Sequence, residues 1–231
     1  MSRTRTPLSR ERVFAAAVAV ADADGLAHVT MRRVAGELGV EAMSLYHHVA
    51  NKEALLDGLL EALMAEVDES VAAVERRSPE PDWRRALRRR FLTARSAMLR
   101  HPWAPQLITS RTSVPASVYG YYDRVLGTMV DGGLSYHLAH RGLHAFGSMA
   151  LGFAQELFAP PGGEDVDPAA EEEEMAAMAG AFPHLAAMVA SEVHDAGDEV
   201  LGWCDSQTEF EFTLDLLLDG LERASRSRDA R

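Results

Sequence analysis

Apolar residues along this chain recur every three to four positions, which is the spacing of one face of an α-helix. The clearest example runs from Leu55 to Val71 and follows Asn51, so a long amphipathic helix is predicted over about residues 51–77. No stretch shows the alternation of apolar and polar residues that is typical of a half-buried strand. The pattern therefore predicts an all-α protein.

Helix caps and glycines divide the N-terminal part of the chain into short segments. Ser9, Thr30 and Asn51 can each accept a hydrogen bond from the free N–H groups at the start of a helix. Gly25 and Gly39 can end a helix or form a tight turn, because glycine tolerates a positive φ. We therefore expect three short helices and one long one, at about residues 9–25, 30–38, 41–48 and 51–77.

Prolines interrupt the helical pattern in the rest of the chain, at Pro79, Pro81 and Pro102. Further helices are predicted at about 82–100, 104–110, 114–131, 134–158 and 206–225, with one or two more between 169 and 201. The Pro- and Gly-rich segment 159–168 and the acidic run 171–174 are predicted to form an exposed loop that enters a helix.

The net charge of −12 argues against a nucleic-acid partner until it is divided along the chain. Residues 1–52 contain seven Lys and Arg and five Asp and Glu, a net charge of +2, whereas the remaining residues carry −14. The acidity therefore belongs to the C-terminal part alone. Such asymmetry of charge indicates that the two parts of the chain have different functions.

The single cysteine, Cys204, excludes an intrachain disulfide and is typical of a reducing compartment. No apolar run approaches the roughly 20 residues of a membrane span, and residues 1–7 lack the apolar core of a signal peptide. We therefore expect a soluble, cytoplasmic protein with no membrane partner.

The segment from residue 30 to residue 48 has the features of a helix-turn-helix. Ala35 is small enough for two helices to cross, Gly39 can form the turn, and Leu45 can anchor the second helix in the core. The second helix would then lie in the major groove and present its outward side chains to the bases. The alternative is an ordinary helical hairpin. The outward side chains are Ala42, Met43, Ser44, Tyr46, His47 and His48.

Residues 30–56 closely resemble the DNA-binding signature of the tetracycline-repressor (TetR) family, most specifically at Leu45-Tyr46, at His48-Val49 and at residues 51–55. The resemblance covers residues 9–60 strongly and residues 82–158 more loosely. It implies an all-helical, homodimeric transcriptional regulator. A three-helix head at residues 1–52 would bind double-stranded operator DNA, and a helical body at residues 53–231 would dimerise and bind a small-molecule effector.

The resemblance also implies which residues contact DNA. Arg32, Tyr46 and Lys52 match positions that usually touch phosphates or the groove edge, although each could instead be a surface residue or, for Tyr46, a core residue. Ala42 and Met43 offer only apolar contacts to bases, so we expect Ser44, His47 and Arg32 to contribute to operator recognition. The complete predicted set is Thr30, Arg32, Ala42, Met43, Ser44, Tyr46, His47, His48 and Lys52.

The match to the tetracycline repressors does not extend to their ligand. Their expected metal-binding histidine falls on Leu107 and a drug-contacting histidine falls on Asp68, although Glu156 matches a position that assists metal binding. This departure argues against a magnesium–tetracycline effector, and we predict an aromatic or mixed-polarity molecule instead. The predicted pocket residues, each of which could also be plain core, are His101, Leu107, Ser110, Arg111, Tyr122, Val125, Met129, His140, His144, Phe153 and Glu156.

No metal or other cofactor is predicted. His140 and His144 have the i,i+4 spacing of a metal-binding pair, but the sequence offers no clear third ligand nearby. No nucleophile–base motif or Gly-rich phosphate loop is present either, so an enzyme is not expected.

The body contains two further sequence patterns, one charged and one apolar. Five arginines between Arg84 and Arg90 could form a second nucleic-acid patch, but the nearby acids Glu75, Glu80 and Asp82 favour an ion-paired helix face. The helices near 134–158 and 206–225 are predicted to form the dimer as an intersubunit four-helix bundle, with burial inside one subunit as the alternative. An apolar stripe on the second of these helices contains Phe210, Leu214, Leu217, Leu218 and Leu221.

Together these features predict a repressor that binds a palindromic operator as a homodimer and is released by a small molecule. The alternatives are an activator and a helical interaction module that does not bind DNA.

Overall fold

The computed structural model describes residues 7–153, 180–184, 186–187 and 206–229, and these residues contain helices and turns but no strand. The all-α prediction is confirmed. None of the described helices is both long enough and apolar enough to cross a bilayer. The helices are α1 (Arg10–Asp24), η1 (Leu26–His28), α2 (Met31–Leu38), α3 (Ala42–Leu45), α4 (Lys52–Arg77), α5 (Trp83–Arg100), α6 (Ala104–Ser110), α7 (Ala116–Asp131), α8 (Tyr136–Gly152) and α11 (Ser206–Asp229).

The predicted helix caps are present in the head. The Ser9 hydroxyl accepts a hydrogen bond from the Arg12 N–H at the start of α1, and the Asn51 side chain accepts one from the Ala54 N–H at the start of α4. Helix α1 ends at Gly25, which has a φ of 82°. Local sequence signals therefore determine where these helices begin and end.

The turn between α2 and α3 is the predicted one. Gly39 has the left-handed backbone conformation, with a φ of 64°, and Leu45 is fully buried behind it. The third helix, however, is shorter than the predicted 41–48. The N–H groups of His48 and Val49 both donate to the carbonyl of Leu45, so the chain leaves the helix as a tight turn before the extended Asn51.

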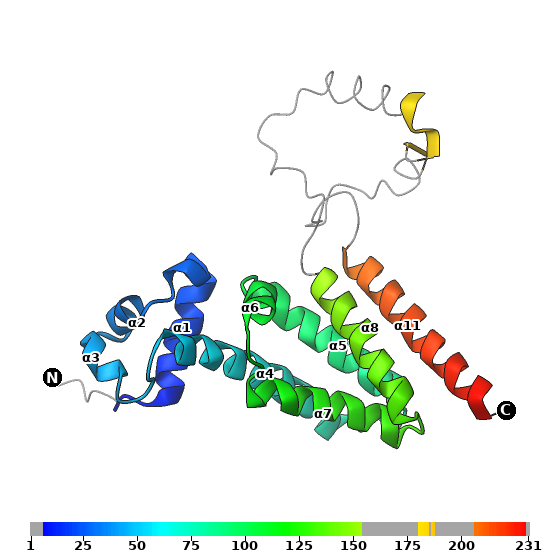
Figure 1. Cartoon of the computed structure of the whole chain (residues 1–231), viewed down its shortest axis with the longest axis horizontal. Helices are drawn as coiled ribbons and strands as arrows, with labels where there is room; N and C mark the ends of the chain where they lie inside the picture. The colour runs from blue at the N-terminus through cyan, green and yellow to red at the C-terminus, as the bar shows by residue number, and fades with distance from the viewer. Residues whose placement is uncertain (1–6, 154–179, 185, 188–205, 230–231) are drawn as a thin grey trace.

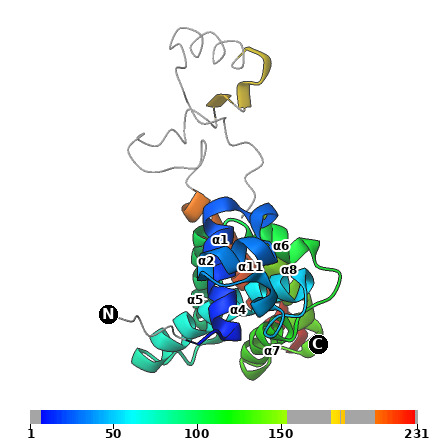
Figure 2. The same cartoon turned by 90° about the vertical axis from the view of Figure 1, so that its left-hand side faces the viewer.

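Helix α4 leads from the head along the body, where α5, α7, α8 and α11 pack beside one another (Figure 1). Viewed from the head end, α1 and α2 lie in front of the body (Figure 2). The rings of Phe91 on α5 and Phe146 on α8 stack at 4.7 Å between centroids, and Phe210 of α11 is fully buried. Helices α8 and α11 therefore share a core with α5, at the end of the molecule away from the head (Figure 1).

The predicted division at residue 52 coincides with the first residue of α4. Because α1 packs on α4, that helix contacts the head as well as the body, and the division into two domains stays a prediction. The predicted loop at 159–168 and the acidic run at 171–174 lie outside the described residues.

Head and body meet where Phe14 of α1 covers Gly58 of α4. A Cβ atom built on Gly58 would lie 2.0 Å from the Phe14 ring, whereas one built on Gly36 of α2 would meet nothing within 4 Å. We expect Gly58→Ala to destabilise the protein by about 1–3 kcal/mol, because the buried ring must move. Chemical denaturation of the full chain measures this change.

Gly36→Ala is the matched control. It should be neutral or stabilise the protein by up to about 1 kcal/mol, since alanine favours a helix more than glycine does. Equal stability of the Gly58→Ala variant and the parent would contradict the close contact between α1 and α4.

Candidate functional site

The outer face of the head presents the predicted DNA-contacting residues of the second short helix. The side chain of Met43 is 72% exposed and that of Tyr46 is 47% exposed, whereas Leu45 and Val49 are buried. Tyr46 is therefore not a core residue, and its ring and hydroxyl are available to a partner. Of the other predicted residues, His47 is exposed, and Ala42, Ser44 and His48 are half-buried.

Exposed cations also lie on the helices before and after this segment. Arg32 on α2 and Lys52 at the start of α4 are exposed and form no ion pair within the described residues. The neighbouring Arg33 differs, because its guanidinium donates to Asp24 at 3.1 Å and to Glu37 at 2.9 Å. Of the two adjacent arginines, Arg32 is thus the one whose charge is available to a phosphate.

Thr30 belongs to the predicted DNA-binding set, and it also has a structural function. Its hydroxyl oxygen accepts a hydrogen bond of 3.1 Å from the Arg33 N–H and so caps α2. A hydroxyl that accepts one hydrogen bond can still donate its own hydrogen. Thr30 can therefore both fix the start of α2 and donate to a phosphate oxygen.

The predicted pocket residues of the body occupy several different environments. Leu107, Val125 and Met129 are buried in the core, and the half-buried Phe153 lies 5.6 Å from Phe210 between ring centroids. Tyr122, His140, His144 and Ser110 are exposed, and the Ser110 hydroxyl donates to the carbonyl of Leu107. Glu156 lies outside the described residues.

His101 and Arg111 both form ion pairs with α4. Arg111 contacts Glu53 and Asp57 at 2.6 Å each, and its pKa is raised because these carboxylates outweigh the larger single effect of burial. His101 contacts Glu66 of α4 at 2.9 Å and Asp22 of α1 at 2.7 Å. These two residues thus connect the body to α4 and to the head.

A polar cluster that the sequence reasoning missed surrounds Asp68. The side chains of Arg90 from α5 and Arg124 from α7 each donate to this carboxylate at 3.0 Å, and Arg90 is almost fully buried. Arg90 also lies over the ring of Tyr121, 5.7 Å from its centroid, and burial raises the pKa of the Tyr121 hydroxyl. No local motif points to this cluster, because its members lie on three helices.

The arginine run on α5 forms the ion-paired face that the sequence favoured, not a free basic patch. Arg84 binds Asp219 and Glu222, and Arg88 binds Glu211 and Asp215. The nearby acids are mostly not the partners, because these four acids belong to α11. In the part of the chain that the structure describes, Arg85 is the only one of the five arginines that pairs with a nearby acid, Glu80.

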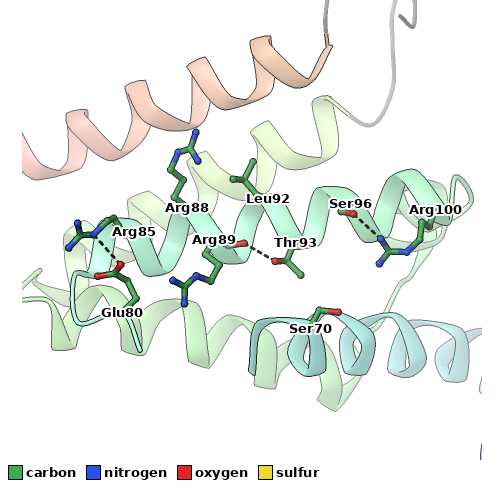
Figure 3. A pocket seen from close by; sticks show the side chains of 9 residues that line it. All are labelled: Ser70, Glu80, Arg85, Arg88, Arg89, Leu92, Thr93, Ser96 and Arg100. Carbon is green, nitrogen blue, oxygen red and sulfur yellow. Dashed lines mark hydrogen bonds and ion pairs between the residues drawn. The ribbon is translucent and has the colours of Figure 1, made fainter. Parts of the chain in front are cut away.

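A groove with a volume of about 580 Å³ lies between α4 and α5 (Figure 3). A smaller one of about 370 Å³ adjoins Trp83 and Gly132. Neither groove is lined by a predicted pocket residue, so the location of the effector pocket stays a prediction. The residues that line the larger groove are Ser70, Glu80, Arg85, Arg88, Arg89, Leu92, Thr93, Ser96 and Arg100.

The head and its exposed second short helix define a helix-turn-helix protein of the DNA-binding class. Residues 13–59 match the family model of bacterial regulatory proteins of the tetR family. Residues 77–225 match the model of the tetracyclin repressor-like C-terminal domain, which covers more than half of the chain. The chain therefore belongs to the TetR family of bacterial transcriptional regulators, which are not enzymes.

Curated relatives agree with this assignment. The transcriptional repressor DrrR1 of Streptomyces coeruleorubidus is 37% identical over 134 residues, which are 55% of this chain and 46% of the relative. A helix-turn-helix regulator of Saccharopolyspora erythraea is 36% identical over 48% of this chain and 44% of its own length. The chain therefore matches less than half the length of these two relatives. The class C tetracycline repressor of Escherichia coli is 28% identical over 94% of this chain and 91% of the repressor.

Solved structures show the same fold over nearly the whole chain. A possible TetR family regulator from Streptomyces coelicolor A3(2) has a TM-score of 0.70 and 29% identity, covering 94% of this chain and 100% of the other. A TetR variant from Acinetobacter baumannii in complex with minocycline has a TM-score of 0.60 and 25% identity, covering 94% of each chain.

Proposed function

We propose that this protein is a cytoplasmic, ligand-responsive repressor that binds a palindromic operator as a homodimer and is released by a small molecule. The observation that carries the proposal is the face formed by α3 and its neighbours. There Met43 and Tyr46 are exposed, and Arg32 and Lys52 before and after them in the sequence are exposed cations that pair with no acid of the described part of the chain. Repression is preferred to activation because DrrR1 and the class C tetracycline repressor are described as repressors.

The proposed homodimer forms through α8 and α11. On α11, Phe212 is 60% exposed and Leu216 is 50% exposed, and they lie one helical turn apart with Gly220 a further turn along. An exposed apolar stripe of this kind on a protein surface is typical of an interface. Phe210, Leu214 and Leu218 are buried within the subunit, so the dimer would use the opposite side of the helix from the one that the sequence stripe emphasised.

The proposed effector binds in the body and acts on the head through α4. A ligand can shift the equilibrium between two head positions only by its difference in affinity for them, and a nearly complete shift needs about 5.5 kcal/mol. Leu107 and Asp68 stand where tetracycline repressors are expected to have histidines, and Asp68 is already bound by Arg90 and Arg124. These contacts support an effector other than a metal–tetracycline complex.

Selecting genomic DNA fragments on the purified protein tests operator binding directly. We expect Lys52→Gln to weaken binding to every selected fragment and to reduce the slope of log K against log salt by about 0.9, because one phosphate contact is lost. Ser44→Ala should instead change the preference at particular base pairs, by about 1–3 kcal/mol.

Arg77→Gln removes an exposed cation from the opposite end of α4 and is the matched control, which should leave the affinity and the slope unchanged. If the parent protein selects no fragment, or if Lys52→Gln and Arg77→Gln behave alike, the proposed DNA-binding face is wrong.

The dimer is tested by Phe212→Ser and Leu216→Ser, measured by sedimentation velocity over a range of concentrations. Each substitution removes an apolar side chain from both halves of the interface and should raise the dissociation constant by about tenfold or more. Leu99→Ser on α5 is the control, because Leu99 is 48% exposed but lies outside α8 and α11. Dissociation in the control alone would contradict the proposed interface.

The choice of effector class is tested by adding minocycline and Mg²⁺ to the protein bound to a selected fragment. We expect no release, because Leu107 offers no imidazole to a metal and the Asp68 carboxylate is held by two arginines. A class C tetracycline repressor on its own operator should be released in parallel. Release of both proteins at the same concentration of drug would overturn the proposed effector class.

A further inference from the structure

His101 lies at the corner between α5 and α6 and joins three parts of the molecule. Its Nδ1 atom is 2.7 Å from an Asp22 carboxylate oxygen on α1, and its Nε2 atom is 2.9 Å from a Glu66 carboxylate oxygen on α4. The His101 side chain is only 11% exposed. One imidazole thus bridges a carboxylate of the head and a carboxylate of the connecting helix.

This geometry depends on the charge of the ring. A neutral imidazole carries one N–H group, so it can donate to only one of the two carboxylates and must direct a lone pair at the other. A protonated imidazole donates to both. The arrangement of Asp22, His101 and Glu66 is therefore complete only when His101 carries a proton on each nitrogen.

Neighbouring groups hold the two carboxylates in place. The Trp103 indole N–H donates to the same Asp22 oxygen at 2.6 Å, and the Trp103 and His101 rings are 5.4 Å apart between centroids. Arg100 at the end of α5 donates to Glu66 at 3.1 Å. The charged groups around His101 are thus the anions Asp22 and Glu66 and the cation Arg100.

The balance of these effects favours the protonated ring. Burial, the largest single effect, lowers the pKa of His101, but the hydrogen bonds and charges of Asp22 and Glu66 together raise it above the ordinary value of 6.5. The Glu66 pKa is lowered, because Arg100 and His101 outweigh the larger single effect of its own burial.

The place of Asp22 on α1 gives this contact its importance. Two other links from α1 to α4, the Phe14 ring on Gly58 and the ion pair of Arg10 with Glu61, lie nearer the start of α1. Asp22 is twelve residues beyond Arg10, which is about 18 Å along a helix. Without the His101 contact, the far end of α1 would still receive the Trp103 hydrogen bond at Asp22, but it would lose its ionic link to α4.

We propose that Asp22, His101 and Glu66 form a proton-dependent link that positions the DNA-binding head on the body. Its effect on operator binding rests on the function proposed above, whereas its effect on stability does not. Because the histidine pKa is raised in the folded protein, the link is fully formed below about pH 6.5 and is lost as the pH rises through the higher value. Operator affinity therefore contains a component that changes as the pH rises above about 6.5.

His101→Gln tests the link, because glutamine keeps a hydrogen-bonding side chain but cannot gain a proton. We expect the stability difference between parent and variant in chemical denaturation to be larger at pH 6 than at pH 9. The ratio of their operator affinities should also change several-fold across this range. The other histidines, including His47 and His48 of the recognition segment, are the same in both proteins and cancel in the ratio.

Arg10→Gln is the control, since it breaks another contact between α1 and α4 that contains no histidine. Its stability difference from the parent should not depend on pH in this range. A proton NMR titration should place the His101 pKa above the ordinary value in the parent, and Asp22→Asn should lower it.

Two results would overturn the proposal. One is a difference between the parent and His101→Gln that is the same at pH 6 and pH 9 in both stability and operator affinity. The other is a His101 pKa at or below the ordinary value. If the parent binds no DNA at all, the stability and NMR measurements still decide whether the link exists, and the proposed function fails separately.

Discussion

Helix α4 pairs five of its acidic side chains with cations from the elements around it, and the relation of head to body depends on these pairs. Glu53 and Asp57 bind Arg111 beyond α6, Glu61 binds Arg10 of α1, Glu66 binds Arg100 and His101, and Asp68 binds Arg90 and Arg124. A rotation of α4 about its axis would break several of these contacts together. The helix therefore tends to move as one piece with the side chains that hold it.

Most of these ion pairs determine position rather than stability. Exposed pairs typically contribute about 0–1 kcal/mol, whereas burying a large apolar side chain contributes about 1.5–3 kcal/mol. The pairs of Arg84 and Arg88 with α11 are partly exposed, so the attachment of α11 depends mainly on the buried Phe210, Leu214 and Leu218. The ion pairs then select one register of α11 along α5. Part of the negative charge of the body therefore belongs to acids that pair with the body's own arginines.

The sequence predicted those parts of the fold that depend on local signals. The caps at Ser9, Thr30 and Asn51 and the turn at Gly39 require only neighbouring residues, and all four are present. The exposed position of Met43 follows from helical spacing around the buried Leu45. Contacts between distant residues left no such signal. Asp22 and His101 are 79 positions apart, and the acids that bind Arg84 and Arg88 are more than 120 positions away. A charged residue can be read directly from the sequence, but its ion-pair partner depends on which helices pack together.

The cations around α4 differ in one respect that bears on regulation. Arginine stays protonated at any physiological pH, so the contacts of Arg10, Arg90, Arg111 and Arg124 keep their charge. Histidine alone among these partners can lose its charge near neutrality. An effector that displaces α5 or α6 would have to move arginine pairs that keep their charge. It would also act on His101, whose contact with Asp22 reaches the far end of α1. Such an effector and proton release would thus act on the same contact. Each should therefore alter the apparent strength of the other, since two ligands that shift one equilibrium are thermodynamically linked.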